Sequence, residues 1–412
     1  MQQHSITRFI GIPDHTPTDF HFLDQAGQPT DDDAQVAEVV VELMRSIRNF
    51  RCPCGRTFTT YYDVTDRFVR DLPWGPWKKV WLMVPRFRVD CPECGVRTEE
   101  LDWIVPLRRH TKRLADAVAW ACRETRNIKS IAEEYALGWD LVKSIDKEAL
   151  KERLDPPDLS GLRHLALDEF SVGRRHRYAT IFLDTDSNRI VWICTGHDTQ
   201  SVVDVFVNVF GPGVCDGIEA VAMDWWRPYE HAARHCLTNA EIVWDFFHIV
   251  KLYNHKVIDR IRLDEANRCE SDQQRRLIKG TKFILLKNPE NLVDDEPARL
   301  KALLAANKTL FTAYVLRDAL KQLWHYTSPA AALPWFEGWY DRAIRSRIAP
   351  LKSFARQLKD RIDGVLAHCH HHISTGPLEG INNTVKLIKR TAYGFRDQEY
   401  FFYKLRGHFP GG

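Results

Sequence analysis

Two acidic residues lie in apolar segments where a charged side chain is unusual. Asp168 interrupts the run HLALDEF at residues 164–170, and Asp224 directly follows the run VAM at residues 221–223. Buried strands rarely hold a charged residue unless it is paired or binds a metal. If the two strands are neighbours in one sheet, both carboxylates emerge at the same edge. The pattern therefore predicts a metal site.

A third carboxylate, Glu379, is expected at the start of the last helical segment. Three carboxylates can hold two divalent ions about 3.5–4 Å apart, which activate a water or a 3′-hydroxyl and stabilise the leaving oxygen of a phosphodiester. Hard oxygen ligands select Mg²⁺ or Mn²⁺. The helix dipole alone also favours an acid in a first turn, so other acids remain open. They are Glu337 and Glu399 in place of Glu379 and, more weakly, Glu169 and Asp184 in place of Asp168.

Four cysteines form two close pairs, Cys52 with Cys54 and Cys91 with Cys94. In a reducing compartment, four thiolates at such spacings suit one tetrahedral Zn²⁺ ion, and the glycine after each pair allows a tight turn. The first pair is one residue shorter than the usual C-x-x-C, so a nearby histidine could replace one thiolate. The alternative is four unrelated structural cysteines. We expect the other six cysteines to be small core residues.

Residues 131–145 fit a helix, a short turn and a second helix, and Gly138 is expected to take the left-handed conformation in the turn. Leu141, Val142 and Ile145 can pack the second helix against the first. That helix would enter a DNA major groove, although a helical hairpin inside a larger core fits the same pattern. The side chains expected near bases or phosphates are Trp139, Asp140, Lys143 and Lys147 on this helix, and Arg108, Arg109, Lys112 and Arg113 before it.

The order of apolar runs indicates the elements that must position these residues. Residues 162–250 follow the order β-β-β-α-β-α-β, which is typical of an α/β domain with a mixed sheet. We expect a multidomain α/β chain, in which a mixed-sheet core is interrupted by an all-α insertion and preceded by a small β-rich zinc module and a helix-turn-helix domain. The expected segments are 1–45 (N-terminal), 46–103 (zinc-binding module), 104–158 (helix-turn-helix), 159–250 (core, first part), 251–374 (insertion) and 375–412 (last core helix and basic C-terminal segment).

The charge is segregated along the chain. The 412 residues hold 58 Lys and Arg against 55 Asp and Glu, and the net charge of +3 does not by itself suggest a nucleic-acid partner. Residues 1–41, however, carry one basic and seven acidic residues, whereas residues 342–361 carry seven basic and one acidic, and residues 380–408 six and two. The basic segments flank Glu379 in the chain, which favours a DNA substrate.

The composition limits the class of protein. With 44% apolar and 27% charged residues, the chain is not disordered. No apolar run is long enough to span a bilayer, and the N-terminus lacks the features of a signal peptide. These observations predict a cytoplasmic protein without a membrane partner.

Taken together, the motifs resemble those of the DDE transposases of bacterial insertion sequences, in the group with an N-terminal zinc module followed by a helix-turn-helix. The resemblance covers residues 45–410. The matching stretches are Cys91-Pro92-Glu93-Cys94, residues 128–147, 164–170 and 222–224, WDFFHIVK at 244–251, residues 376–383, Arg390 and YGFR at 393–396.

The resemblance implies a ribonuclease-H-like catalytic core in which Asp168, Asp224 and Glu379 form the metal-binding triad, with Mg²⁺ or Mn²⁺ at the active site. It also implies that Asp245 and His248, which form a D-x-x-H motif after the fifth strand, support the site. A strand-end cap and a buried histidine are the alternative interpretation of these two residues.

The function implied is that of a transposase that binds the terminal inverted repeats of its element, cleaves the ends and transfers their 3′-hydroxyls to target DNA. Synapsis of two ends needs at least two subunits, so a dimer on DNA is expected, associated with the bacterial nucleoid. Trp225 and Trp226 could stack on an unpaired base, although packing is the simpler interpretation, and the histidines at 368 and 370–372 are expected on a helix or loop next to DNA. The residues expected on DNA phosphates at the C-terminal end are Lys386, Lys389, Arg390 and Arg396.

Two other functions remain open on the sequence. A non-catalytic DNA-binding regulator could use the zinc module and the helix-turn-helix, but it does not account for acids inside strands. A structure-specific nuclease could use the same fold, and strand-transfer products would separate it from a transposase.

Overall fold

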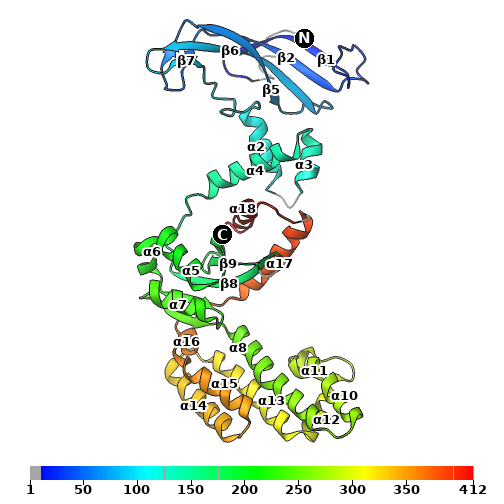
Figure 1. Cartoon of the computed structure of the whole chain (residues 1–412), viewed down its shortest axis with the longest axis vertical. Coiled ribbons are helices and arrows are strands. Elements are labelled where there is room, and N and C mark those ends of the chain that lie inside the picture. The colour runs from blue at the N-terminus through cyan, green and yellow to red at the C-terminus, as the bar shows by residue number, and fades with distance from the viewer. Residues whose placement is uncertain (1–10, 124–126, 174–176, 393, 412) are drawn as a thin grey trace. The chain divides into compact units, whose positions relative to one another are not determined.

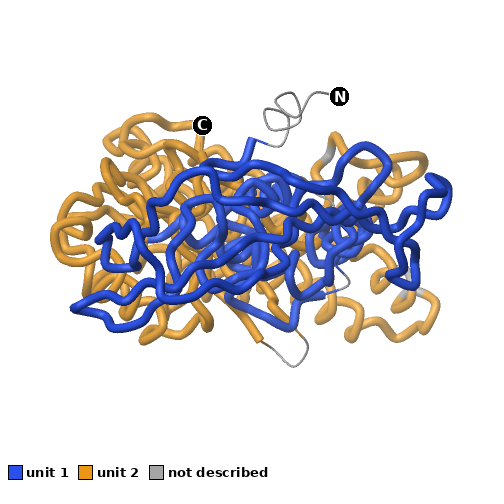
Figure 2. Tube along the Cα trace, turned by 90° about the horizontal axis from the view of Figure 1, so that it is seen from above, with its two compact units in different colours: residues 1–155, 387–408 blue, residues 156–386, 409–412 orange. Residues whose placement is uncertain are grey.

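A computed structural model describes residues 11–123, 127–173, 177–392 and 394–411 (Figure 1). The chain forms two compact units, which Figure 2 colours separately. The first unit comprises Met1–Asp155 and Leu387–His408, and the second comprises Pro156–Lys386 and Phe409–Gly412.

The first unit begins with a five-stranded sheet in the order β1-β2-β6-β5, with β7 paired to β6. Only β2 and β6 run parallel; the other pairs are antiparallel. Alternate side chains of the sheet, such as Val39, Val41, Leu82 and Val84, form a buried core. The strands are β1 (His15–Leu23), β2 (Glu38–Arg45), β5 (Asp63–Asp71), β6 (Lys79–Cys91) and β7 (Gly95–Thr98), with a separate hairpin of β3 (Phe50–Arg51) and β4 (Thr57–Phe58).

Helices complete the first unit. They are α2 (Lys112–Ala121), α3 (Ile128–Tyr135), α4 (Trp139–Leu154) and α18 (Gln398–His408), together with the last residues of α17 (Gly376–Thr391). The predicted helix-turn-helix is confirmed: Val142 and Ile145 of α4 are buried against Ile131 and Ala132 of α3.

The prediction for the turn glycine is wrong. Gly138 has φ −68° and forms the N-cap of α4, and Ala136 takes the left-handed conformation with φ +48°. The helix α3 ends in that residue, whose N–H returns to the carbonyl of Ala132. The left-handed residue is therefore set by the end of the first helix, two residues before the glycine.

The second unit holds a mixed sheet in the order β10-β9-β8-β11-β12. Pairs β10–β9 and β9–β8 are antiparallel, and β8–β11 and β11–β12 are parallel. The predicted β-β-β-α-β-α-β order is confirmed. The elements are β8 (His164–Gly173), β9 (Arg177–Asp184), β10 (Arg189–Thr195), α5 (Thr199–Val205), η1 (Phe206–Phe210), α6 (Gly211–Gly217), β11 (Ala220–Met223), α7 (Arg227–Cys236) and β12 (Glu241–Trp244).

A helical region separates β12 from α17. One apolar cluster runs from the sheet into these helices and includes Phe182, Tyr229, Trp339 and Phe354. The helical elements are α8 (Phe246–Tyr253), η2 (Asn254–Asp259), α9 (Arg260–Arg268), α10 (Asp272–Gly280), α11 (Lys282–Leu286), η3 (Pro289–Asn291), α12 (Glu296–Ala306), α13 (Lys308–Lys321), η4 (Gln322–His325), α14 (Pro329–Arg345), α15 (Ala349–Lys359), α16 (Ile362–Leu366) and η5 (Ala367–Cys369).

Among the described residues, none of the helices combines the length and the apolar character that a bilayer crossing requires.

The packing of α16 on β12 leaves no room for a side chain at Gly364. A Cβ there would overlap the Trp244 indole and lie 2.9 Å from the carbonyl oxygen of Ile242. We expect Gly364→Ala to destabilise the protein by about 1–3 kcal/mol, because overpacking forces the backbone or the indole to move. Thermal unfolding should show a melting temperature lower by several degrees. Gly338→Ala is the matched control, because a Cβ on that helical residue meets nothing within 4 Å. An unchanged melting temperature for Gly364→Ala would contradict this packing.

Candidate functional site

The parallel pairing of β8 and β11 sets the two predicted strand acids side by side. The register pairs Ala220 with His164 and Ala222 with Ala166. Continued by two residues, the same register brings Asp224, which directly follows β11, level with Asp168 in the middle of β8. Since side chains alternate along a strand, the two aspartates share a face with small alanines, whereas Leu167 and Met223, which directly precede them, belong to the main apolar core.

Burial and like charge act on both carboxyl groups. Burial raises the pKa of Asp224 to about 7, and the negative charges of Glu169, Asp168 and Asp245 add to this effect. Burial also raises the pKa of Asp168, although the Glu169 N–H, His248 and Asn382 oppose it. A buried acid and a half-buried acid that repel one another are stable when a cation lies between them.

One carboxylate oxygen of Asp224 accepts no hydrogen bond from the described residues. Asp224 Oδ1 is buried and makes no hydrogen bond within the part of the chain that the structure describes. The other oxygen, Oδ2, lies 4.0 Å from His248 Nδ1. A buried carboxylate oxygen without a donor fits a divalent cation, for which carboxylate oxygens are the preferred ligands.

The D-x-x-H residues lie beside this pair. Asp245 ends the β12 ladder and caps α8, because its Oδ1 accepts the His248 N–H at 3.1 Å. Its Oδ2 accepts the Thr375 N–H at 2.9 Å, directly before α17. Asp245 therefore joins the end of β12 to the start of the helix that carries Glu379, while the His248 ring faces Asp224. Asp245 is therefore a cap, as the alternative interpretation has it, and its second oxygen also binds the backbone directly before α17.

The third predicted acid, Glu379, does not lie within common metal-ligand distance of both Asp168 and Asp224. Glu379 is exposed in the first turn of α17. Among the described residues, the three acids do not come within common metal-ligand distance. Three residues further along α17, Asn382 donates its Nδ2 to Asp168 Oδ2 at 2.9 Å. Residues three apart lie on the same side of a helix, so Glu379 is one turn from the contact that α17 makes with β8.

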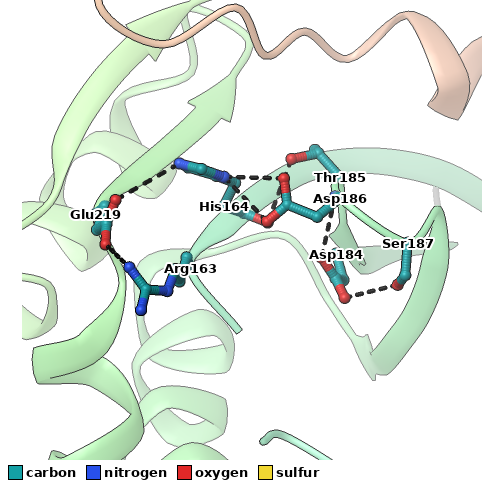
Figure 3. Close-up of polar contacts among 7 residues, drawn as sticks. All are labelled: Arg163, His164, Asp184, Thr185, Asp186, Ser187 and Glu219. Carbon is teal, nitrogen blue, oxygen red and sulfur yellow. Dashed lines mark hydrogen bonds and ion pairs between the residues drawn. The ribbon is translucent and has the colours of Figure 1, made fainter. Parts of the chain in front are cut away.

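The alternative acids have other partners or positions. Glu169 accepts a hydrogen bond from His197 at 2.7 Å. Asp184 lies opposite Leu165, toward the other end of β8, where Ser187 and the Asp186 N–H donate to it (Figure 3). Glu337 is exposed on α14, and Glu399 pairs with Lys147 at 2.7 Å.

A polar network covers the opposite, amino end of β8 and β11. His164 bonds to Asp186 at 2.9 Å and lies 3.8 Å from Glu219, which also pairs with Arg163 (Figure 3). These groups partner one another at the end of the sheet away from Asp168 and Asp224.

The four paired cysteines come together in the first unit. Their Sγ atoms all lie within 4.8 Å of one another, and Cys54 Sγ is 3.7 Å from Cys91 Sγ. Four sulfurs at about 2.3 Å from one tetrahedral ion are roughly 3.8 Å apart, so the spacing fits. The N–H groups of Cys94 and Glu93 lower the pKa of Cys91 to about 7, whereas the Cys54 thiol raises the pKa of Cys94 to about 12.

The two turns have the predicted geometry. Gly55 and Gly95 have φ +92° and +68°, the region that glycine adopts without strain. The C-x-C pair lies in the β3–β4 hairpin, and the C-x-x-C pair joins β6 to β7. The short first pair therefore supplies both of its thiols, and no histidine among the described residues joins the cluster.

Several predicted DNA-binding residues take part in contacts within the first unit. Lys143 and Lys147 both pair with Asp397, at 2.9 and 3.1 Å. Arg108 pairs with Glu148 at 2.6 Å, and Arg113 donates to the buried Asp71 at 2.8 Å. Lys389 lies over the Phe401 ring at 5.6 Å. The remaining predicted contacts are exposed: Arg109, Lys112, Trp139, Asp140, Lys386, Arg390 and Arg396.

The tryptophans after Asp224 have different environments. Trp225 packs against Phe354 and the Arg361 guanidinium. Trp226 stacks on the His197 ring and donates to its carbonyl oxygen, and it is 40% exposed.

The histidines before α17 also differ from one another. His368 is buried and bonds to the carbonyl oxygens of Val365 and Tyr326, whereas His370 and His371 face Glu241.

Comparison with known proteins identifies the family. A family model described as a transposase matches residues 165–405, which span β8 to α18 and contain all three predicted acids. The chain belongs to the ISL3 family of transposases. A second model, the helix-turn-helix domain of transposase family ISL3, matches residues 99–150. The chain is thus an insertion-sequence transposase, and neither a regulator without a catalytic domain nor a separate nuclease accounts for it.

The relatives of this transposase match it over most of its length. The transposase for insertion sequence element IS1001 of Bordetella parapertussis is 43% identical over 360 residues, 87% of this chain and 88% of that protein. The transposase for IS1557 of Mycobacterium tuberculosis is 28% identical, over 92% and 91% of the two chains. Among solved structures, the Drosophila P element transposase strand transfer complex has a TM-score of 0.37 at 9% identity, covering 72% of this chain and 91% of that one, which is too low to establish a shared fold.

Sequence reasoning gave no role to two residues at this site. Asn382 lies inside a motif that matches the transposases, but its contact with Asp168 was not anticipated. Its spacing from Glu379 was the available signal, since i and i+3 share a helix face. Lys251 follows His248 at the same interval, and both residues line a cleft of about 1130 Å³ together with Asp224. The positive charge of Lys251 lowers the pKa of Asp224.

The repulsion between the paired acids predicts the effect of removing one charge. Without metal at pH 8, Asp224→Asn should raise the melting temperature by on the order of several degrees, because a carboxyl whose pKa is raised in the folded protein disfavours that state when it is ionised. Asp341→Asn, at an exposed helical acid, is the control and should change little. A clear decrease for Asp224→Asn would show that the carboxylate stabilises the fold, contrary to this account.

Proposed function

We propose that Asp168, Asp224 and Glu379 hold the Mg²⁺ or Mn²⁺ ions with which this transposase cleaves the ends of its element and joins the 3′-hydroxyls to target DNA. The observation that carries the proposal is the parallel register of β8 and β11, which, continued by two residues, brings the half-buried Asp224 level with the buried Asp168. Bound there, the ions would activate a water or 3′-hydroxyl and stabilise the leaving oxygen of a phosphodiester.

Each residue near the proposed metal site has a separate role. Asp168 and Asp224 supply oxygens from a rigid parallel pair of strands, so their separation is set by the sheet. Asp245 links the end of β12 to Thr375 and so positions the first turn of α17. Glu379 would approach the pair from that turn once positive charge offsets the repulsion among the acids. Lys251, which extends the face of α8 that carries His248, places a cation beside the cleft where a DNA phosphate would lie.

We infer that the mixed sheet and its following helix form a ribonuclease-H-like core. The support is the sheet itself: three antiparallel strands in sequence, then two parallel strands added beside the first of them. Asp168 lies on the central strand β8 and Asp224 directly after its parallel neighbour β11, so a core of this type presents both acids at one edge.

We infer that the four thiols bind one structural Zn²⁺ ion. Their mutual distances and the two glycine turns support a tetrahedral site. Because thiols so close together cannot all ionise without a cation, zinc binding would also stabilise the β3–β4 hairpin against β6 and β7.

We propose that DNA binding uses the helix-turn-helix for the terminal inverted repeats and the exposed cations at the C-terminal end for phosphates. Arg109, Lys112, Arg390 and Arg396 are exposed and suit this role. Lys143 and Lys147 would reach DNA by exchanging their pairing with Asp397 for a phosphate. Two ends must be held together before transfer, so we propose a dimer on DNA.

Replacement of a catalytic acid tests the proposal. Asp224→Ala should reduce cleavage of a duplex carrying an element end by roughly 10³-fold or more, because several kcal/mol of metal-derived stabilisation is lost. Binding of the same duplex, measured by gel shift, should persist. Asp186→Ala, at an exposed acid of the same second unit, is the control and should still cleave. Cleavage by Asp224→Ala at the wild-type rate would overturn the assignment.

Metal analysis tests the thiol site. Purified protein should contain one zinc per chain by mass spectrometry of the dissolved metal, and Cys91→Ser should hold less than half of that. Cys269→Ser, at a partly buried cysteine outside the cluster, should keep the full amount. Wild-type protein with well under one equivalent after purification in zinc-containing medium would refute the site.

A further inference from the structure

The side-chain amide of Asn382 makes a hydrogen bond through its nitrogen but none through its oxygen within the described part of the chain. Its Nδ2 donates to Asp168 Oδ2 at 2.9 Å. An ionised carboxylate only accepts hydrogen bonds, so this contact sets the orientation of the amide and turns Oδ1 away from Asp168. Oδ1 is buried, and no group in the described part of the chain donates to it.

A second oxygen without a donor belongs to the same group of residues. Asp224 Oδ1 is equally buried and lacks a donor among the described residues, and the strand register places Asp224 opposite the Asp168 that Asn382 contacts. Buried acceptors without a hydrogen-bond donor are rare, because the loss of hydration on burial costs free energy that no hydrogen bond offsets. Two of them around one pair of acids indicate that a cation is the missing partner.

We propose that Asn382 is an additional ligand of the divalent metal held by Asp168 and Asp224, and at the same time holds Asp168 in position. This inference rests on the proposed function and adds a residue to it. The amide oxygen supplies a hard neutral ligand, which divalent cations accept in proteins, and the NH₂ group keeps the Asp168 carboxylate turned toward α17.

An amide suits this position better than another acid. Asp168, Asp224 and Glu169 already place negative charge here. A further carboxylate would add repulsion in the metal-free protein and, when ionised, could not donate a hydrogen bond to Asp168. An uncharged amide can donate to Asp168 and also offer an oxygen to the metal. The next residue, Asn383, is exposed and accepts from Lys386 at 3.4 Å, so the two neighbouring asparagines have separate environments and provide a matched pair.

Titration of the full chain with Mn²⁺, followed by electron paramagnetic resonance of the free ion, tests the proposal without using activity. Asn382→Leu should weaken Mn²⁺ binding by about 10–100-fold, the range seen when groups that hold metal ligands are removed. Asn382→Asp keeps an oxygen at the position and should bind Mn²⁺ within threefold of wild type or more tightly. Asn383→Leu should bind as wild type does.

The other outcomes are equally informative. Wild-type affinity for Asn382→Leu would overturn the proposal, and equal weakening by Asn382→Leu and Asn382→Asp would overturn the ligand role, because only the bond to Asp168 is lost in both.

Asp224→Asn separates this inference from the proposed function. If Asp224→Asn also binds Mn²⁺ like wild type, the metal site itself is misplaced; if it loses binding while Asn382→Leu does not, only the role of Asn382 fails. Metal-free melting curves check that each variant is folded.

Discussion

The buried Asp168 of β8 and the half-buried Asp224, which directly follows β11, lie close together on adjacent parallel strands, and the surrounding structure holds them there against their repulsion. The register of β8 and β11 sets Asp224 opposite Asp168. Alanines on the same face leave room for the pair, and the apolar neighbours on the other face anchor both strands in the core. The acids therefore cannot move apart without disrupting the sheet. Burial raises the pKa of Asp224 to about 7, and the negative charges of Glu169 and Asp168 add to this effect. A site that is unfavourable when empty and favourable with a cation is the arrangement expected for metal-dependent phosphoryl transfer.

The remaining parts of the site reach the pair from distant positions in the sequence. The helices from α8 to η5 separate β12 from α17, yet Asp245 at the end of β12 bonds to Thr375 immediately before α17. That bond and the Asn382–Asp168 contact hold α17 against the sheet at two places. The helices between β12 and α17 therefore do not disrupt the site, because the chain leaves the sheet at the end of β12 and returns beside that point at the start of α17. Transfer of a phosphoryl group needs ligands within a few tenths of an ångström of their positions, and two contacts on rigid elements meet that requirement better than one.

The features that could be predicted from the sequence are those encoded by neighbouring residues. Acids in apolar strands, paired cysteines followed by glycine, and a helix-turn-helix pattern each depend on a few adjacent positions, and the structure contains all three. The left-handed residue was misassigned to Gly138 because the end of α3, and not the type of residue, selects Ala136. The pairing of Lys143 and Lys147 with Asp397 could not be foreseen, because some 250 residues separate the partners. Asn382 was missed for a similar reason: an amide in a helix has no pattern of its own, and only its contact with Asp168 gives it a role.

We expect one divalent ion to bind between the side chains of Asp168 and Asp224. The most direct measurement is anomalous diffraction from Mn²⁺ in crystals of the full chain bound to an element end. An anomalous peak is expected within about 2.5 Å of a carboxylate oxygen from each of the two aspartates. A bound DNA end with ordered Mn²⁺ that contacts neither aspartate would contradict it.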